Sequence, residues 1–226
     1  MIKRTAAAVS LIAAILLSLL LSSCSFRDTA LSLMGFDTYD YEGEQVIEEL
    51  DPECEEVERL CEMTKMLSLN NPSLPEFTSS TEALRSCHDS ILNYMPCTDF
   101  PKYMGNVELI EKVEAEYPEL GLISVIPAKD FENFVYSFFG GNAKVDHKSG
   151  ELFTYLDKAD VYTSVISPIE NNVKVSVISC ERTERTYRLK FSCSLGEVTS
   201  PVYRALIVNR EDGTSYFKSL VIEASN

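Results

Sequence analysis

The sequence contains no tryptophan and only two histidines in 226 residues. Positive charge is also scarce, because 20 Lys and Arg face 35 Asp and Glu, which gives a formal net charge of −15. Phosphate binding needs clustered Lys and Arg to displace counterions, so this balance argues against nucleic acid as a partner. The lack of tryptophan weakens a carbohydrate-stacking role, although 11 tyrosines leave that role open. Neither a fixed-period repeat nor a low-complexity tract is present, which argues against solenoids and propellers.

The sequence motifs of common hydrolases are missing as well. There is no G-x-S-x-G or H-E-x-x-H, no glycine-rich phosphate loop, and no C-x-x-C pair that would indicate a metal site. His88 directly follows Cys87, and in a helix these two side chains diverge by about 100°, so they cannot form a nucleophile and base pair. His147 lies in a segment typical of a turn, where an exposed histidine is expected. We therefore predict no catalytic residue, no metal site and no cofactor.

Acidic residues could carry chemistry in two places. A pocket in the C-terminal part could contain a carboxylate pair such as Asp157 and Asp160, although the sequence favours no particular pair. The acidic stretch 37–62 lacks the D-x-[DN]-x-[DN]-G loop of a calcium site, and its glutamates fall on a predicted helix, which spreads ligands instead of converging them. We expect that stretch to form a solvated helix face.

The first 24 residues have a sequence typical of a secretory signal. Two basic residues precede an uncharged apolar run from Thr5 to Leu21, which ends in Leu21-Ser22-Ser23-Cys24. This ending resembles the lipobox of bacterial lipoproteins, with Ser23 where Gly or Ala is commonest. The resemblance implies a signal peptide over residues 1–23 and a diacylglycerol, with acyl chains such as palmitate, on Cys24. An uncleaved membrane anchor and a plain secreted protein are the alternatives.

A lipidated cysteine would determine where the rest of the chain lies. Acyl chains hold a domain at a membrane surface because each buried methylene contributes about 0.8 kcal/mol. No second apolar run of spanning length follows Cys24. We therefore expect a lipid anchor in the cell membrane, residues 24–44 as a tether, and the remainder on the extracytoplasmic face.

The chain beyond the signal divides into two parts by charge. Residues 25–120 contain 22 acidic and 6 basic side chains, whereas residues 121–226 contain 13 and 12. The whole composition, 45% hydrophobic and 24% charged, is typical of a folded protein. The charge difference predicts an acidic helical region over residues 45–120 and a separate α+β antiparallel-sheet domain over residues 121–226.

Three helices are expected in the acidic region. Asp51-Pro52 would cap and begin the first, whose apolar residues recur at helical spacing from Cys54 to Leu67. A capping box at Ser79 to Glu82 begins the second, which should end at Pro96. The third should run from Val107 to about Tyr117, with Asn106 as its cap.

The C-terminal part opens with a helix that has one strongly apolar face, and Gly140-Gly141 stops it. That face, typical of packing, consists of Phe131, Phe134, Val135, Phe138 and Phe139. Alternating apolar residues then predict a four-strand antiparallel meander between Val173 and Glu223, with a turn at Asp212-Gly213. Shorter strands near 152–156 and 161–166 could join it. We expect an α+β fold in which an N-terminal helical segment precedes a helix packed on a curved antiparallel sheet.

That order of a helix and a curved sheet is similar to the cystatin-like and nuclear-transport-factor-like cone folds over about residues 125–223. The resemblance implies an extracytoplasmic module, because binding domains and small inhibitors of wall hydrolases share this architecture. A fold of this kind hosts many functions and does not assign one.

Six cysteines remain besides Cys24, and an oxidising compartment would allow disulfides. Cys54 and Cys61 would lie two helical turns apart, about 10.8 Å, which is too far for a bridge between them. Their available partners are Cys87 and Cys97. The alternative is that all four are small buried hydrophobic residues.

For Cys180 and Cys193 the expected strand register is informative. A register that aligns the apolar faces of two strands places Val177 opposite Leu189 and Val173 opposite Cys193, and it turns Cys180 to the other face of the sheet. A direct bridge would then need a bulge or a shifted turn.

The signal segment and the missing motifs together favour a non-enzymatic, membrane-anchored binding or protein-interaction module of the cell envelope. Opposite fields raise encounter rates, so the acidic region predicts a cationic envelope protein, such as a basic wall enzyme, as the partner. The alternative is a cell-envelope hydrolase with a pocket in the C-terminal sheet that uses His147 or a carboxylate.

Overall fold

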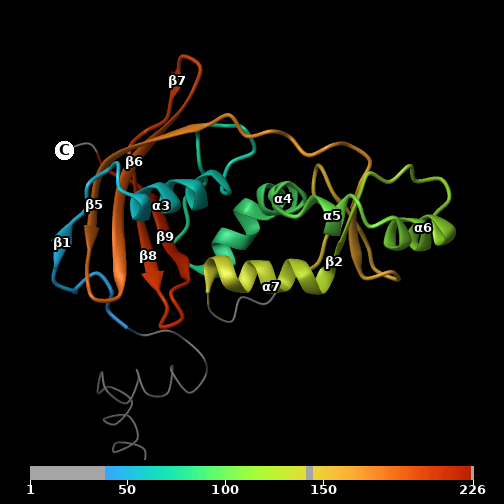
Figure 1. Cartoon of the computed structure of the whole chain (residues 1–226), viewed down its shortest axis with the longest axis horizontal. Helices are drawn as coiled ribbons and strands as arrows, with labels where there is room; N and C mark the ends of the chain where they lie inside the picture. Colours follow the sequence, from blue (N-terminus) through green and yellow to red (C-terminus); the bar gives the residue numbers. More distant parts are fainter. Residues whose placement is uncertain (1–38, 141–144, 225–226) are drawn as a thin grey trace, which may run out of the picture. The chain divides into compact units, whose positions relative to one another are not determined.

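The structure, a computed structural model, describes residues 39–140 and 145–224 (Figure 1). The chain divides into two compact units, Met1–Glu42 and Gly43–Asn226, and the second contains the helices and strands described below. The predicted signal peptide, the lipobox with Cys24 and most of the predicted tether lie outside the described residues. Within the described part, no helix is long and apolar enough to cross a membrane.

The helices of the described residues form where the sequence supplies caps and apolar faces. They are α3 (Glu55–Lys65), α4 (Ser80–Thr98), α5 (Phe100–Tyr103), α6 (Val107–Glu116) and α7 (Ala128–Phe139). The predicted capping box begins α4, because Ser79 Oγ accepts a hydrogen bond from the N–H of Glu82 at 3.3 Å. Asn106 caps α6 in the same way, through the N–H of Leu109 at 3.1 Å. Gly140, with a φ of 63°, ends α7 as predicted.

Two predicted helix ends are wrong. The first helix begins at Glu55 and not at Pro52, because Asp51 forms a turn before it, in which its Oδ1 atom accepts the N–H of Glu53 at 2.9 Å. The second helix continues past Pro96 to its end at Thr98. In that last turn the missing N–H of proline removes only one helical hydrogen bond.

Two antiparallel sheets complete the unit. The larger has the order β1-β5-β6-β8-β9, with β7 paired to β6. Its strands are β1 (Glu48–Glu49), β5 (Lys174–Arg182), β6 (Thr186–Leu195), β7 (Val198–Thr199), β8 (Tyr203–Asn209) and β9 (Ser215–Ile222). The smaller has the order β2-β4-β3, from β2 (Ser124–Pro127), β4 (Val161–Ser164) and β3 (Thr154–Leu156). The α+β fold class is confirmed.

The register of the first hairpin differs from the prediction. Val175 lies opposite Cys193 and Val177 opposite Phe191, and the register shifts between Val177 and Ser179. This bulge inserts one residue, so the strand beyond it presents the opposite alternation. Cys180 therefore points into the core and is fully buried, where the regular register would turn it outward.

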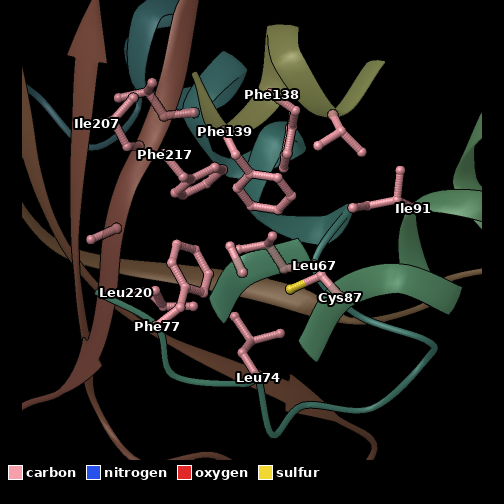
Figure 2. Packing of buried hydrophobic residues seen from close by; sticks show 14 of the residues in the cluster. Leu67, Leu74, Phe77, Cys87, Ile91, Phe138, Phe139, Ile207, Phe217 and Leu220 are labelled. Atoms are coloured by element: carbon pink, nitrogen blue, oxygen red, sulfur yellow. The ribbon is translucent and has the colours of Figure 1, made fainter. Parts of the chain in front are cut away.

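One hydrophobic core joins the helices to the larger sheet (Figure 2). α7 packs against β9 and α4, while α3 packs against β5. Phe138 lies against Phe217 with 5.3 Å between ring centroids and 51° between ring planes, and Phe139 meets Phe77 edge-on at 5.6 Å. The aromatic stripe of α7 is thus a packing face, as predicted. A second cluster, centred on Val113 and Val125, holds α6 against the smaller sheet.

This shared core contradicts the predicted division near Gly121. Leu67, Leu74 and Cys87 from the acidic region lie in the same cluster as Phe217 and Leu220 from the sheet (Figure 2). The whole stretch from Gly43 onward is one compact unit. Charge differs between the two parts because the acidic side chains lie on the outer faces of helices whose inner faces are needed to cover the sheet.

Candidate functional site

A groove of about 560 Å³ runs between α3 and the beginning of β5. Pro52 and Glu53 lie at it ahead of the helix. Its helical wall is formed by Glu58, Cys61, Glu62 and Lys65, which share one face of α3 because they are three or four residues apart. Its other wall is the strand segment Lys174–Val177.

The groove carries net negative charge. Glu53, Glu58 and Glu62 are all exposed at it. Lys65 donates to Glu62 at 2.6 Å, so the charge of this lysine is already paired. Lys174 is exposed on the opposite wall and leaves the acidic side chains in excess.

The strand wall of the groove is also an edge of the larger sheet. The backbone of β1 and its flanking residues pairs with the end of β5: the N–H groups of Ile47 and Leu50 donate to the carbonyls of Arg182 and Cys180, each at 2.8 Å. Over Lys174–Val177, β6 pairs with one side of β5. No described residue pairs as a strand with the other side.

Hydrogen bonds at one end and buried side chains along the inner face of α3 hold the two walls of the groove in place. Asn171, just before β5, donates its side-chain amide to the carbonyls of Lys65 at 2.7 Å and Ser68 at 3.2 Å, at the end of α3. Val57 and Leu60, on the inner face of α3, are fully buried in the core. Both walls are thus fixed by the fold, which lowers the entropic cost of binding.

The cysteines do not form the predicted bridges. All six described cysteines are free thiols. α3 packs on β5 while α4 packs on α7, so the predicted link from Cys54 or Cys61 to Cys87 or Cys97 is not formed. The alternative prediction, that all four cysteines are buried hydrophobic residues, is correct for Cys87 alone. Cys54 and Cys61 are partly exposed, and Cys97 is exposed.

Burial makes three of the thiols weak acids. It raises the pKa of Cys87, Cys180 and Cys193 to about 12. Cys61, which lines the groove, has its pKa raised by partial burial as well. A thiol with a raised pKa is a poor nucleophile at neutral pH, so these residues serve packing.

The two histidines converge on one buried hydroxyl, that of Tyr162. His147 Nδ1 lies 3.0 Å from Tyr162 Oη, and its Nε2 lies 3.2 Å from Glu132 Oε1. On the other side, His88 Nε2 lies 3.5 Å from the same hydroxyl. Tyr162 is fully buried, and burial raises the pKa of its hydroxyl, which remains a hydrogen-bond donor.

This group, termed the Tyr162 network, ties several elements together. His88 comes from α4, Glu132 from α7 and Tyr162 from β4, while His147 precedes β3. The ring of His147 also stacks on Tyr155, with 5.1 Å between centroids and 17° between planes. Glu132 and His147 are its more accessible members, with side chains 37% and 18% exposed. The prediction of an exposed turn histidine is therefore wrong: His147 is a half-buried junction residue.

Asp89 extends the network from α4. Its Oδ1 atom lies 3.5 Å from Nδ1 of His88, and its Oδ2 atom accepts the N–H of Glu151 at 2.8 Å. Desolvation opposes its ionisation, but the nearby His88 ring and hydrogen bonds from the Glu151 and Leu152 backbone outweigh it, and the pKa of Asp89 is lowered. The carboxylate is charged and holds the segment before β3 against the helix.

The carboxylates of Asp157 and Asp160 are used separately. Asp160 accepts the hydroxyl of Tyr155 at 2.7 Å, and this bond raises the pKa of Tyr155 to about 12. Asp157 accepts the N–H of Lys158 at 2.9 Å within a turn. Neither arrangement is that of two carboxylates sharing a substrate.

The structure places no metal site among the described residues, since nowhere in them do three His, Cys, Asp or Glu side chains gather as ligands. The inner face of the larger sheet, where a hydrolase pocket is the alternative expectation, is filled by core side chains. Leu189, Phe191, Ile207 and Phe217 are all fully buried there. A hydrolase stays a prediction, and the Tyr162 network is the group that would have to carry it.

Comparison of the chain with protein families, characterised proteins and solved structures yields no match. The resemblance to bacterial lipoproteins and to the cone folds thus stays a prediction.

Three features of the site could not be predicted from the sequence. Tyr162 and Glu132 each lie 15 residues from His147 and much farther from His88, and only packing unites them. The open edge of β5 depends on where β1 ends, which no local motif marks. Gly150 gives a weak signal, because a glycine just after the His147 turn permits a close approach of another group.

Proposed function

We propose that this chain is a non-enzymatic binding module of the cell envelope, anchored in the membrane through a lipid on Cys24. Its partner is a cationic protein that binds in the groove between α3 and β5. The single observation that carries this proposal is the groove itself, about 560 Å³ in volume, with Glu53, Glu58 and Glu62 exposed along it.

Electrostatics supports a cationic partner. A cleft lined by one sign of charge focuses the field and raises the encounter rate with the opposite charge, and this effect weakens as salt is added. Val175, Val177 and Cys61 supply apolar surface at the same place. A partner with basic and apolar side chains would therefore gain both long-range attraction and burial of apolar area.

Capture from envelope extracts tests the binding proposal. The immobilised full chain should retain a basic protein at low salt and release it at high salt. The triple variant Glu53→Gln, Glu58→Gln, Glu62→Gln should lose most of this capture, because it removes the charge while keeping side-chain size.

A matched control comes from α6, on which Glu108, Glu111 and Glu116 are also exposed. Changing these three to Gln alters the net charge equally but leaves the groove intact, so capture should persist. Equal loss in both variants would mean that only net charge matters. Recovery of no protein at either salt concentration would reject the proposed function.

The anchor is tested separately. Cys24→Ala should release the protein from membranes, because no acyl chain can be attached to alanine. If the variant stays in the membrane fraction after a high-salt wash, the chain is held by something other than a lipid on Cys24. A Ser23→Ala variant, which restores the commonest lipobox residue, should remain membrane-bound.

A further inference from the structure

The unpaired backbone groups of β5 can be identified from its neighbour β6. The N–H of Cys193 donates to Ser200 Oγ at 2.9 Å, and the carbonyl of Cys193 accepts the N–H of Ser200 at 2.8 Å. The backbone of Cys193 is therefore directed away from β5. Because backbone directions alternate along a strand, Ser192 and Ser194 are directed toward β5.

The same alternation assigns the groups on β5. Lys174 lies opposite Ser194 and Ser176 opposite Ser192, so these two residues bond to β6. The N–H and C=O groups of Val175 and Val177 consequently point to the other side, into the edge that lines the groove. No described residue pairs with them there.

Unpaired edge groups are a template for another strand. The available segment is short: four residues span about 13 Å, and the bulge after Val177 and the contacts of β1 from Cys180 onward close it at one end. Asn171 and its bonds to the end of α3 close it at the other end. The geometry admits one short extended segment rather than a long additional strand.

The helical wall determines which side chains that segment should carry. Glu58 and Glu62 of α3 line the groove opposite Lys174–Val177 and are separated by about one helical turn, about 6 Å along the axis. Side chains on one face of an extended peptide recur about every 7 Å. Alternate Lys or Arg residues would therefore meet the glutamates, while the residues between them would face away.

We propose that the groove binds an extended, basic segment of a partner protein by strand addition to Lys174–Val177 of β5. This inference rests on the proposed function and specifies its mode. Main-chain hydrogen bonds to Val175 and Val177 supply alignment. Glu58, and Glu62 in exchange for its exposed ion pair with Lys65, select alternate basic side chains. A second copy of this chain is a poorer occupant of the groove. Its β5 edge carries Lys174, but that edge lies beside its own acidic α3, so pairing two copies would bring the glutamates of one against those of the other.

The test uses a defined probe, the acetylated and amidated peptide Val-Lys-Val-Lys-Val, and isothermal titration calorimetry with the full chain. Two further peptides carry N-methyl groups on alternate amides, one on the Lys amides and one on the Val amides. In a paired strand only one of these two sets points to β5. Strand addition therefore predicts that one methylated peptide binds about tenfold more weakly than the unmodified peptide, because it loses one or two hydrogen bonds. The other methylated peptide should bind as tightly as the unmodified one.

A variant of the chain tests the same bond from the protein side. Val175→Pro removes the N–H directed into the groove but none of the bonds to β6, and it should weaken binding of the unmodified peptide about tenfold. Val175→Ala keeps the N–H and loses the same apolar contact, so it should weaken binding less. If Val175→Pro does not fold, the two methylated peptides decide the question without it.

Each outcome has a definite meaning. Equal binding of both methylated peptides, or equal loss of both, overturns strand addition. If binding still depends on Glu58 and Glu62 in that case, the proposed function stands with side-chain recognition alone. If no peptide binds, sedimentation of the chain shows whether it self-associates. Self-association that Val175→Pro converts to a monomer overturns the inference in favour of a second copy. Failure of the proposed function is recognised independently, by the lack of capture from envelope extracts.

Discussion

Gly150 approaches Asp89 so closely that a Cβ atom on the glycine would lie 1.9 Å from Asp89 Oδ1. The carboxylate occupies the space that a side chain at position 150 would need. It accepts the N–H of Glu151 at 2.8 Å from this position. The lack of a side chain at Gly150 thus lets α4 bind the segment that carries His147.

Gly150→Ala should lower the free energy of unfolding by about 1–3 kcal/mol, because the added methyl group displaces the Asp89 carboxylate from its hydrogen bond. In an Asp89→Ala background the same change should cost less than about 0.5 kcal/mol, since the clash is gone. Chemical denaturation of the four proteins gives the coupling energy. Additive costs would show that the glycine is needed for its backbone and not for this contact.

Phe138→Ala should destabilise the protein by about 3–5 kcal/mol, because it leaves an aromatic-sized void beside Phe217 and Phe139. Phe100 supplies the control: its ring is 58% exposed, and its replacement by Ala should cost less than about 1 kcal/mol. Thermal melting of both variants is sufficient. A shift of only a degree or two for Phe138→Ala would contradict its place in the core.

Cys87 should make stability fall at alkaline pH. Burial raises its pKa from 9.0 in the unfolded chain to about 12 in the folded protein, so above pH 9 only the unfolded chain ionises. The contribution of the buried thiol to the free energy of unfolding is complete below pH 9. It is lost as pH rises toward the folded pKa, at about 1.4 kcal/mol per pH unit. The Cys87→Ala variant has no thiol at this position, so its stability does not fall for this reason.

The stability difference between wild type and Cys87→Ala should accordingly narrow at that rate above pH 9. Denaturant titrations at several alkaline pH values measure it. Cys180 and Cys193 are present in both proteins, so their own ionisation cancels in the comparison. A difference that stays constant with pH would mean that the thiol is accessible to water in the folded state.

A fragment of residues 121–226 should not fold on its own. It retains α7 and every sheet strand except β1 but lacks α3 and α4, whose Leu60, Cys87 and Ile91 are fully buried in the shared core. The exposed inner face of β5 and β6 would favour aggregation. Near-UV circular dichroism should show no fixed tertiary structure for the fragment and a cooperative transition for the full chain. A soluble, cooperatively melting fragment would restore a domain boundary near Gly121.

Local signals made several elements predictable. α4 and α6 follow from their caps at Ser79 and Asn106, and α7 from its apolar spacing and Gly140, because capping and periodicity act over a few neighbouring residues. The β8–β9 hairpin follows from Asp212-Gly213, where Gly213 has a φ of 82°. By contrast, the start of α3 was mispredicted because Asp51 satisfies a local turn as readily as a helix.

The charge pattern was informative about surfaces but not about domains. It correctly marked where acidic helix faces lie, since charged side chains avoid burial whatever the fold. It could not show that the opposite faces of the same helices cover β5, β6 and β9, because apolar residues of one helix do not reveal which partner they bury against. The separation at Gly121 was wrong for that reason.

The sequence by itself determined the fold class, most helix boundaries and the excess of acidic charge, all of which depend on interactions between near neighbours or on composition. Tertiary structure alone decided that His88 and His147 meet at Tyr162, that a bulge turns Cys180 into the core, and that β1 leaves Lys174–Val177 open beside an acidic helix. These features join residues distant in the chain. Their positions depend on how whole elements pack, and packing is set by the sum of many weak contacts that no single motif contains.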